Sequence, residues 1–236
     1  DGVGENQINA TNITTDAKIF IRSGATNDSI RVDNLVADIR GHEFGNFWSV
    51  YQGELDINLK ANADTVDIIT GSDDTTVTTR SSSTADIDAY HLANNKVLDL
   101  DGVGAVIVDR AGSITIDASN DLPFDAETTS PLTGTLNVTT KDSANLTLLT
   151  GTNNTTLDSD DGVATVDATE LNDNLTLTLI GSSNVTVTEL QGNVQAADSS
   201  GVLDITTAAT IPDTKLTVTT GTNHATVTGT GSGDEI

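Results

Sequence analysis

Apolar and polar residues alternate in short runs along most of the chain. In residues 175–179 (LTLTL), Leu175, Leu177 and Leu179 alternate with Thr176 and Thr178. Successive side chains of a β-strand point to opposite faces, so the leucines of this run would line a core and the threonines would face solvent. Runs of this kind, without an intervening helical period, predict an all-β protein made of short strands.

The runs are joined by a recurring phrase: a strand, a glycine turn with polar Asn and Thr, and a second strand. The clearest copy is residues 146–157 (LTLLTGTNNTTL). Further copies occupy residues 19–30, 67–77, 177–187 and 216–227. In every copy the sixth residue after the glycine is aliphatic: Ile30, Val77, Leu157, Val187 and Val227.

The turn glycines recur at a nearly constant distance. From Gly71 through Gly112, Gly151 and Gly181 to Gly221 they lie about 40 residues apart, with one shorter interval of about 30, and such periods indicate solenoids, propellers or arrays. Short strands with small glycine or Asn corners favour a parallel β-helix or β-roll-like solenoid, in which coils stack about 4.8 Å apart. A tandem β-sandwich is the alternative, although the repeat is short for such a domain.

The repeat also suggests a domain organisation. We expect residues 1–52 to form the N-terminal part of the solenoid and residues 53–236 to form a repeat solenoid continuous with it. Residues 79–95 and 119–133 would be loops inserted between turns. The chain does not begin with Met and stops in what resembles another glycine turn, which predicts a processed product or part of a longer parent.

Residues 41–53 (GHEFGNFWSVYQG) contain four of the seven aromatic residues: Phe44, Phe47, Trp48 and Tyr51. Exposed aromatic side chains are typical of interface hot spots and of platforms on which sugars stack. These four are therefore predicted contacts for a ligand or partner. The alternative is a loop that folds its aromatic side chains over the scaffold.

The charge balance narrows the choice of partner. The chain has 35 acidic and 10 basic residues, a net charge of −25, so nucleic acid and anionic membrane surfaces are disfavoured and cations are favoured. There is no cysteine, hence no disulfide framework and no thiolate chemistry. No run approaches the roughly 18 apolar residues that predict a membrane helix, so we expect no membrane insertion.

The turn pattern G-x-x-[ND]-x-[ST]-aliphatic resembles a degenerate form of the RTX nonapeptide G-G-x-G-x-D-x-U-x. The closest copy is residues 24–30 (GATNDSI), where Asp28 takes the aspartate position; the other turns hold Thr75, Thr155, Val185 and Ala225 there. The chain as a whole is similar in style to the β-solenoid portions of RTX-type surface-layer proteins and large bacterial adhesins. That resemblance implies type I secretion, an extracellular location and folding driven by calcium.

Calcium is also the ligand that the acidic residues favour, because it takes six to eight oxygen ligands from carboxylates, amides and carbonyls. The predicted metal ligands are clustered carboxylates, for which the alternative is a solvated surface charge. They are Asp28 with Asp33, Asp73 with Asp74, Asp99 with Asp101, Asp158 with Asp160 and Asp161, and Asp234 near the end of the chain.

No motif predicts catalysis: the three histidines share no metal-ligand spacing and serine occurs in no nucleophile elbow. We therefore expect a protein that is not an enzyme: a calcium-stabilised, extracellular structural protein of a bacterial surface layer or adhesin. Its partners would be further copies of itself, neighbouring segments of its parent or a cell-surface glycan. The alternative is a carbohydrate-binding or carbohydrate-cleaving β-helix.

Overall fold

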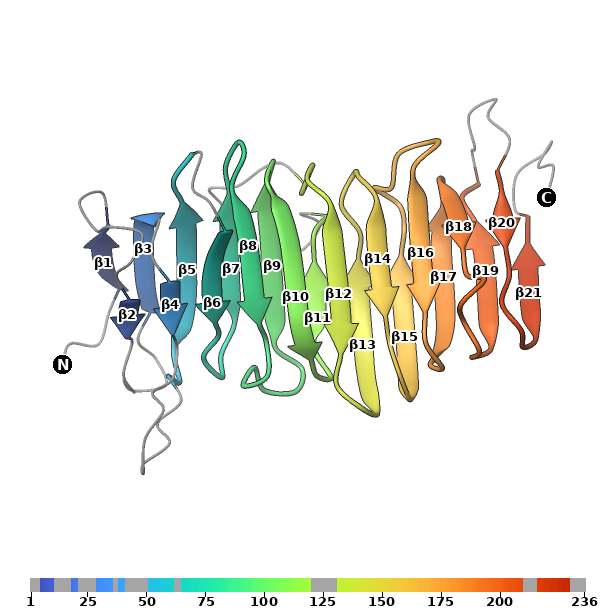
Figure 1. Ribbon diagram of the computed structural model, residues 1–236, viewed down its shortest axis with the longest axis horizontal. Coiled ribbons are helices and arrows are strands. Elements are labelled where there is room, and N and C mark those ends of the chain that lie inside the picture. The colour runs from blue at the N-terminus through green and yellow to red at the C-terminus, as the bar shows by residue number, and fades with distance from the viewer. Residues whose placement is uncertain are drawn as a thin grey trace.

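The computed structural model describes residues 5–10, 18–20, 29–35, 38–40, 51–61, 65–119, 131–209 and 216–229. The strands in these residues form an elongated stack of coils, with β1 and β21 at opposite ends (Figure 1). No helix long and apolar enough to cross a bilayer occurs in this part of the chain.

Two parallel sheets make up the stack, and successive strands alternate between them. The 11-stranded sheet, called sheet A, takes every odd-numbered strand; the 10-stranded sheet, called sheet B, takes every even-numbered strand. Sheet A contains, in spatial order, β1 (Glu5–Asn9), β3 (Ser29–Leu35), β5 (Glu54–Leu59), β7 (Thr75–Thr79), β9 (Val97–Gly102), β11 (Thr115–Asp117), β13 (Ala144–Leu149), β15 (Gly162–Asp167), β17 (Asn184–Leu190), β19 (Leu203–Thr207) and β21 (Ala225–Thr228). Sheet B contains β2 (Lys18–Phe20), β4 (Asp38–Arg40), β6 (Thr65–Ile69), β8 (Thr84–Asp88), β10 (Ala105–Ala111), β12 (Leu136–Thr140), β14 (Thr155–Asp158), β16 (Thr176–Ile180), β18 (Asn193–Gln195) and β20 (Val218–Thr219).

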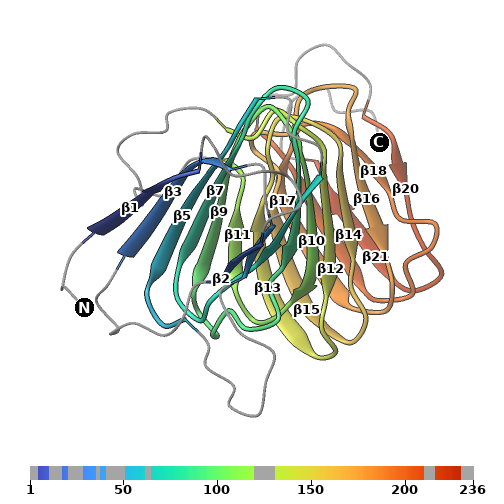
Figure 2. The same cartoon turned by 60° about the vertical axis from the view of Figure 1, so that its left-hand side comes forward.

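Each coil therefore contributes one strand to each sheet, and Figure 2 shows the two sheets facing each other across the interior. Strands pair in parallel register with the strand one coil away; Ala144, for example, lies opposite Gly162, and Leu146 opposite Ala164. The chain is thus a parallel β-solenoid, as the alternation predicts, and not a tandem β-sandwich, because every strand pair of the two sheets is parallel.

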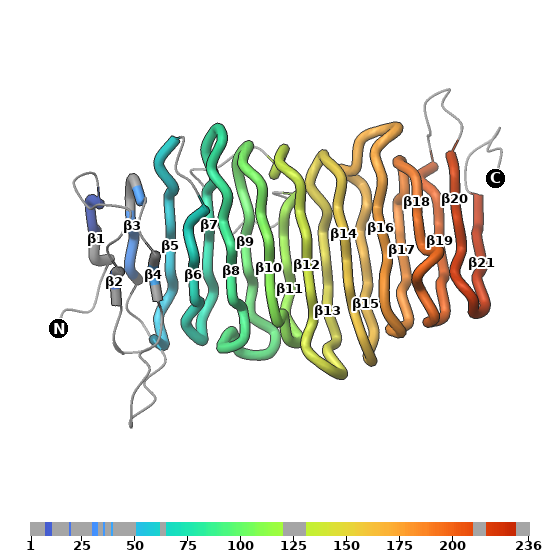
Figure 3. The backbone as a smooth tube through the Cα atoms, viewed as in Figure 1, coloured from blue at the N-terminus to red at the C-terminus, as the bar shows by residue number. Residues whose placement is uncertain are grey.

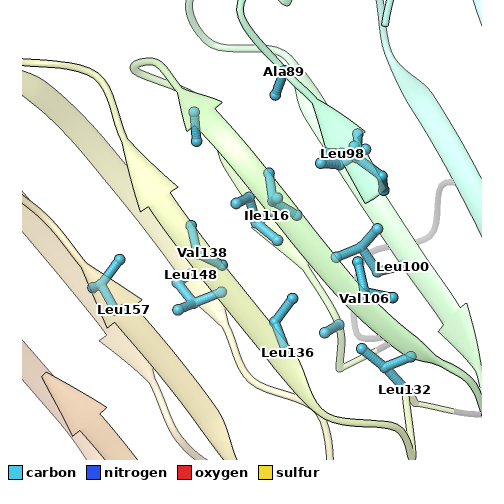
Figure 4. Packing of buried hydrophobic residues seen from close by; sticks show 14 of the residues in the cluster. Ala89, Leu98, Leu100, Val106, Ile116, Leu132, Leu136, Val138, Leu148 and Leu157 are labelled. Carbon is cyan, nitrogen blue, oxygen red and sulfur yellow. The ribbon is translucent and has the colours of Figure 1, made fainter. Parts of the chain in front are cut away.

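Aliphatic side chains fill the interior between the sheets. Leu98, Leu100 and Ile116 of sheet A pack with Val106 and Val138 of sheet B (Figure 4), and all five side chains are buried. Burial of one such side chain stabilises the fold by about 1.5–3 kcal/mol. Because each coil supplies only a few of them, the core is a narrow column, and its stability depends on neighbouring coils.

The recurring phrase sits at both corners of the coil (Figure 3). Gly71 lies between β6 and β7, where the chain passes from sheet B to sheet A, whereas Gly151 lies between β13 and β14, where it passes from A to B. Half a coil, one strand with one corner, is therefore the unit that the sequence repeats. An interval of about 40 residues between glycines at the same corner, such as Gly181 and Gly221, corresponds to two coils, since parallel partners such as Asn145 and Val163 are one coil apart.

One predicted loop is wrong in part. Residues 79–95 contain β8 (Thr84–Asp88), a full member of sheet B between β6 and β10. Its sequence, TADID, alternates like the other strands: Ala85 and Ile87 are buried and face the core. The segment lacks the glycine phrase, which is why a reading based on turn glycines placed it outside the repeat.

Candidate functional site

Asp73 and Asp74 form a corner that the protein completes with its own groups. The Asp73 carboxylate accepts a hydrogen bond from the Asp74 amide (2.9 Å), and Asp74 Oδ1 accepts one from the amide of Val97 on the next coil (2.7 Å). Lys96 forms ion pairs with both carboxylates, and its Nζ lies 3.2 Å from Asp74 Oδ2. The hydrogen bond to Asp73 raises the pKa of Lys96, with a further contribution from Asp74. Each of the two carboxylates therefore accepts a hydrogen bond from a backbone amide and forms an ion pair with Lys96.

Asp99 and Asp101 lie on the outer face of β9, yet both side chains are buried. Asp117, which sequence reasoning missed, stands opposite Asp99 in the register of β9 and β11 and is buried too. Thr76 donates a long hydrogen bond to Asp99 (3.5 Å), and Ser119 donates its amide and hydroxyl to Asp117 (3.0 and 2.7 Å). Three acidic side chains thus gather on one buried patch of an outer sheet face.

Asp158, Asp160 and Asp161 lie around the corner between β14 and β15. Asp158 is half-buried, and Asp160 and Asp161 are exposed. Asp161 has a left-handed backbone (φ 51°), and its amide donates to the hydroxyl of Ser182 on the next coil (3.2 Å). This corner presents carboxylates to solvent.

The structure does not describe the side chains of the other predicted metal ligands or of three of the four predicted aromatic contacts. Asp28 and Asp234 lie outside the described residues, as do Phe44, Phe47 and Trp48. Asp33 is in β3 opposite Asn9, but its side chain is outside the described part.

Tyr51 is only 1% exposed, and a side chain at Gly71 would collide with its carbonyl oxygen. The structure therefore places Tyr51 in the core, away from any sugar ring.

A metal cage is not formed by the residues that the structure describes: no group of three or more His, Cys, Asp or Glu side chains among them is arranged to hold an ion.

An unpredicted cluster lies where the chain leaves β8, β10 and β12. Arg110 lies over the ring of Tyr90 (4.8 Å from its guanidinium carbon to the ring centroid), and Lys141 Nζ lies 4.3 Å from the same centroid. Lys141 also donates a hydrogen bond to the Tyr90 carbonyl, and Arg110 pairs with Asp88, with Nε 3.0 Å from Oδ1. The three residues come from successive coils, so only the register between coils brings them together.

Aspartates also face one another across sheet B. Asp67 lies opposite Asp86, and Asp88 opposite Asp109. Burial raises the pKa of Asp86, and the charges of Asp109 and Asp67 raise it further. Like charges on adjacent strands destabilise a sheet, so this outer face carries an electrostatic repulsion.

A scan against protein-family models, a search of curated proteins and a search of solved structures each gave no match to this chain. Its class therefore rests on its own architecture: a two-sheet parallel β-solenoid with a narrow aliphatic core and hydrogen-bonded polar corners.

Proposed function

We propose that this chain is a structural extracellular protein: a rod-like, self-assembling segment of a bacterial surface layer or adhesin. The observation that supports this most directly is the continuity of both ladders, from β1 to β21 in sheet A and from β2 to β20 in sheet B. Each coil is joined to the next by backbone hydrogen bonds in two sheets, and the interior is filled along the way. A continuous stack of this kind suits a spacer or a scaffold.

The polar surface agrees with such a role. In β13 and β15, side chains alternate between buried and exposed, so the outer face carries groups such as Asn145, Thr147 and Thr165. Side-chain bonds across coils add to the ladders: Asn172 and Asn153 each donate to the backbone carbonyl of a residue 20 positions earlier. Such bonds would resist sliding of one coil past the next.

Calcium belongs to this proposal through the net charge of −25, the absence of cysteine and the resemblance to RTX-type solenoids. The described carboxylates do not form a cage for it. Calcium would therefore act either through weak binding to the acidic surface, by lowering self-repulsion, or at acidic residues such as Asp28 and Asp234 outside the described part.

A thermal melt followed by circular dichroism tests the calcium dependence, and light scattering with electron microscopy tests assembly. We expect millimolar calcium to raise Tm and to promote ordered assemblies, and a chelator to reverse both effects. An unchanged melt would remove calcium from the proposal. A protein that stays monomeric at high concentration, with and without calcium, would contradict the scaffold role.

The carbohydrate-binding alternative depends on Phe44, Phe47 and Trp48, which lie outside the described residues, since Tyr51 is in the core. A glycan screen with a Trp48→Ala variant tests it. Binding that Trp48→Ala abolishes would favour the alternative over the scaffold.

A further inference from the structure

Tyr90, Arg110 and Lys141, here called the cationic patch, are unusual on a protein with 35 acidic and 10 basic residues. Tyr90 is the exposed centre of the patch, 48% exposed, and two cations lie within 5 Å of its ring centroid. Cation–π contacts of this kind are attractive, and they hold the two positive groups near one another.

The charge of the patch is only partly neutralised. Arg110 is paired with Asp88, whereas Lys141 makes no ion pair with any residue that the structure describes. Burial lowers the pKa of Lys141, and the nearby charge of Arg110 lowers it further. Another carboxylate beside Lys141 would relieve this repulsion, so the patch is suited to an anionic partner.

The geometry favours a carboxylate over a stacked sugar. Arg110 and Lys141 lie close to the ring of Tyr90, so they restrict the ring face on which a sugar would stack. Arg110 side-chain atoms remain more than half exposed, which leaves guanidinium donors for a partner oxygen.

The same edge of the solenoid also carries exposed carboxylates. Arg110 is near the end of β10, just before the turn into β11, and Lys141 lies in the turn from β12 into β13. Asp160 lies at the equivalent turn before β15, and Asp198 lies at the one before β19. Asp160 and Asp198 are exposed and make no ion pair with the residues that the structure describes. Along this edge, Arg110 and Lys141, with the exposed Asp142 beside Lys141, are followed nearer β21 by the exposed carboxylates of Asp160 and Asp198.

We propose that the cationic patch docks onto the acidic part of this edge, around Asp160 and Asp198, on a second copy of the chain. This inference rests on the proposed self-assembly and names its contact. If two rods lie side by side in opposite directions, the patch of each faces the carboxylates of the other, and both contacts form in a two-fold symmetric pair. The net charge of −25 opposes association at long range, so the pairing depends on this local complementarity.

Sedimentation equilibrium, at one fixed calcium concentration, tests the contact. The wild-type protein is expected to associate as its concentration rises. Lys141→Glu should weaken the association at least tenfold, whereas Lys60→Glu should weaken it much less. Lys60 is a matched control because it is exposed and makes no ion pair within the described residues, and its reversal changes the net charge equally.

A charge swap separates docking from misfolding. A copy with Asp160→Lys and Asp198→Lys should not associate with itself, but mixing it with the Lys141→Glu copy should restore a complex with one of each. Circular dichroism verifies that each variant is folded, and Lys141→Gln replaces Lys141→Glu if the latter fails to fold.

Each other outcome contradicts the inference in a recognisable way. Association that Lys141→Glu and Lys60→Glu weaken equally would overturn the contact but leave self-assembly intact. A wild-type protein that remains monomeric would overturn both. A monomer that binds polygalacturonate, with binding lost in Lys141→Glu, would show that an acidic polysaccharide occupies the patch instead.

Discussion

Two corners of the solenoid form the same pattern of hydrogen bonds to backbone amides, one with charged aspartates and the other with neutral asparagines. At Asp73–Asp74 the first side chain accepts the amide of the second, and the second accepts the amide of Val97 on the next coil (2.7 Å). At Asn153–Asn154 the same bonds recur: Asn153 accepts the amide of Asn154 (2.7 Å), and Asn154 accepts the amide of Thr176 (2.9 Å).

The difference between the corners is the lysine. Lys96 pairs with both carboxylates of the acidic corner, whereas the amide corner needs no counter-charge. The shared requirement is thus a side-chain oxygen at two consecutive positions, which Asp and Asn both supply. A pair of aspartates at a turn is therefore explained by the fold itself, and calcium is not needed to account for it.

The largest expected loss of stability comes from replacing the glycine that precedes the two polar residues in each corner. A side chain at Gly71 would meet the Tyr51 carbonyl oxygen at 2.6 Å, and one at Gly151 would meet the Leu132 oxygen at 2.2 Å. Because these obstacles are backbone atoms, Gly71→Ala and Gly151→Ala should each lower the free energy of unfolding by about 3 kcal/mol, measured by urea denaturation. Gly112→Ala is the control, since its new side chain would meet only the flexible end of Lys141 at 3.4 Å. Equal losses at all three glycines would contradict the argument.

Removal of the acceptor should have the next largest effect. Asp74→Ala leaves the half-buried Val97 amide without its bond and removes one of the two ion pairs of Lys96, so we expect a loss of about 1–3 kcal/mol. Asn154→Ala should cost less, about 1 kcal/mol, because it removes the bond to Thr176 without exposing a charge. Asp74→Asn keeps the acceptor and should retain most of the stability. If Asp74→Asn were as harmful as Asp74→Ala, the carboxylate charge rather than the oxygen would be essential.

Because only the acidic corner contains a lysine, only its contribution to stability should depend on the titration of Lys96. The pKa of Lys96 is raised in the folded state, so its contribution is complete below the unfolded pKa of about 10.4 and is lost as pH rises through the folded value. Lys96→Met should lower the free energy of unfolding at pH 7, and its deficit relative to wild type should shrink in alkaline solution. Denaturation of both proteins at pH 7 and near pH 11 measures this. A deficit that is independent of pH would mean that Lys96 acts by packing alone.

The repulsion between aspartates on the outer face of sheet B should have the smallest effect on stability. Asp86→Asn removes the repulsion from Asp67 and Asp109 and should stabilise the protein at pH 7 by about 0.5 kcal/mol. The folded pKa of Asp86 is raised, so the wild-type side chain favours folding below its unfolded pKa of about 3.9 and loses that contribution as pH rises through the folded value. The advantage of Asp86→Asn should therefore appear as pH increases through this window. A destabilised variant at pH 7 would indicate that Asp86 has a favourable partner.

The alternation alone predicted much of the fold, because a strand with one buried face needs a period of two. In β16 and β17, Leu177, Leu179, Val185 and Val187 are buried as their pattern predicts. The use of the glycine turns to delimit the repeat failed at β8, where the residues alternate as in the other strands but the turn phrase is absent.

The candidate sites were less accessible to sequence reasoning. Asp73 and Asp74 were predicted as metal ligands, and nothing in the sequence indicated that Lys96 and Val97 lie beside them on the next coil. Asp117 is too far along the chain from Asp99 to be grouped with it without the register. Knowing which residues lie one coil apart would have placed Lys96 and Val97 beside Asp74, and Asp117 beside Asp99.

The sequence by itself determined the strands, the inward rows and the polar glycine corners, because these depend on neighbours within a few residues. Only the tertiary structure decided which corner each copy of the phrase takes, and which charges meet across coils, as Tyr90, Arg110 and Lys141 do. The physical reason is that coil length varies between parallel partners, so the register of one coil on the next follows from packing of the whole stack.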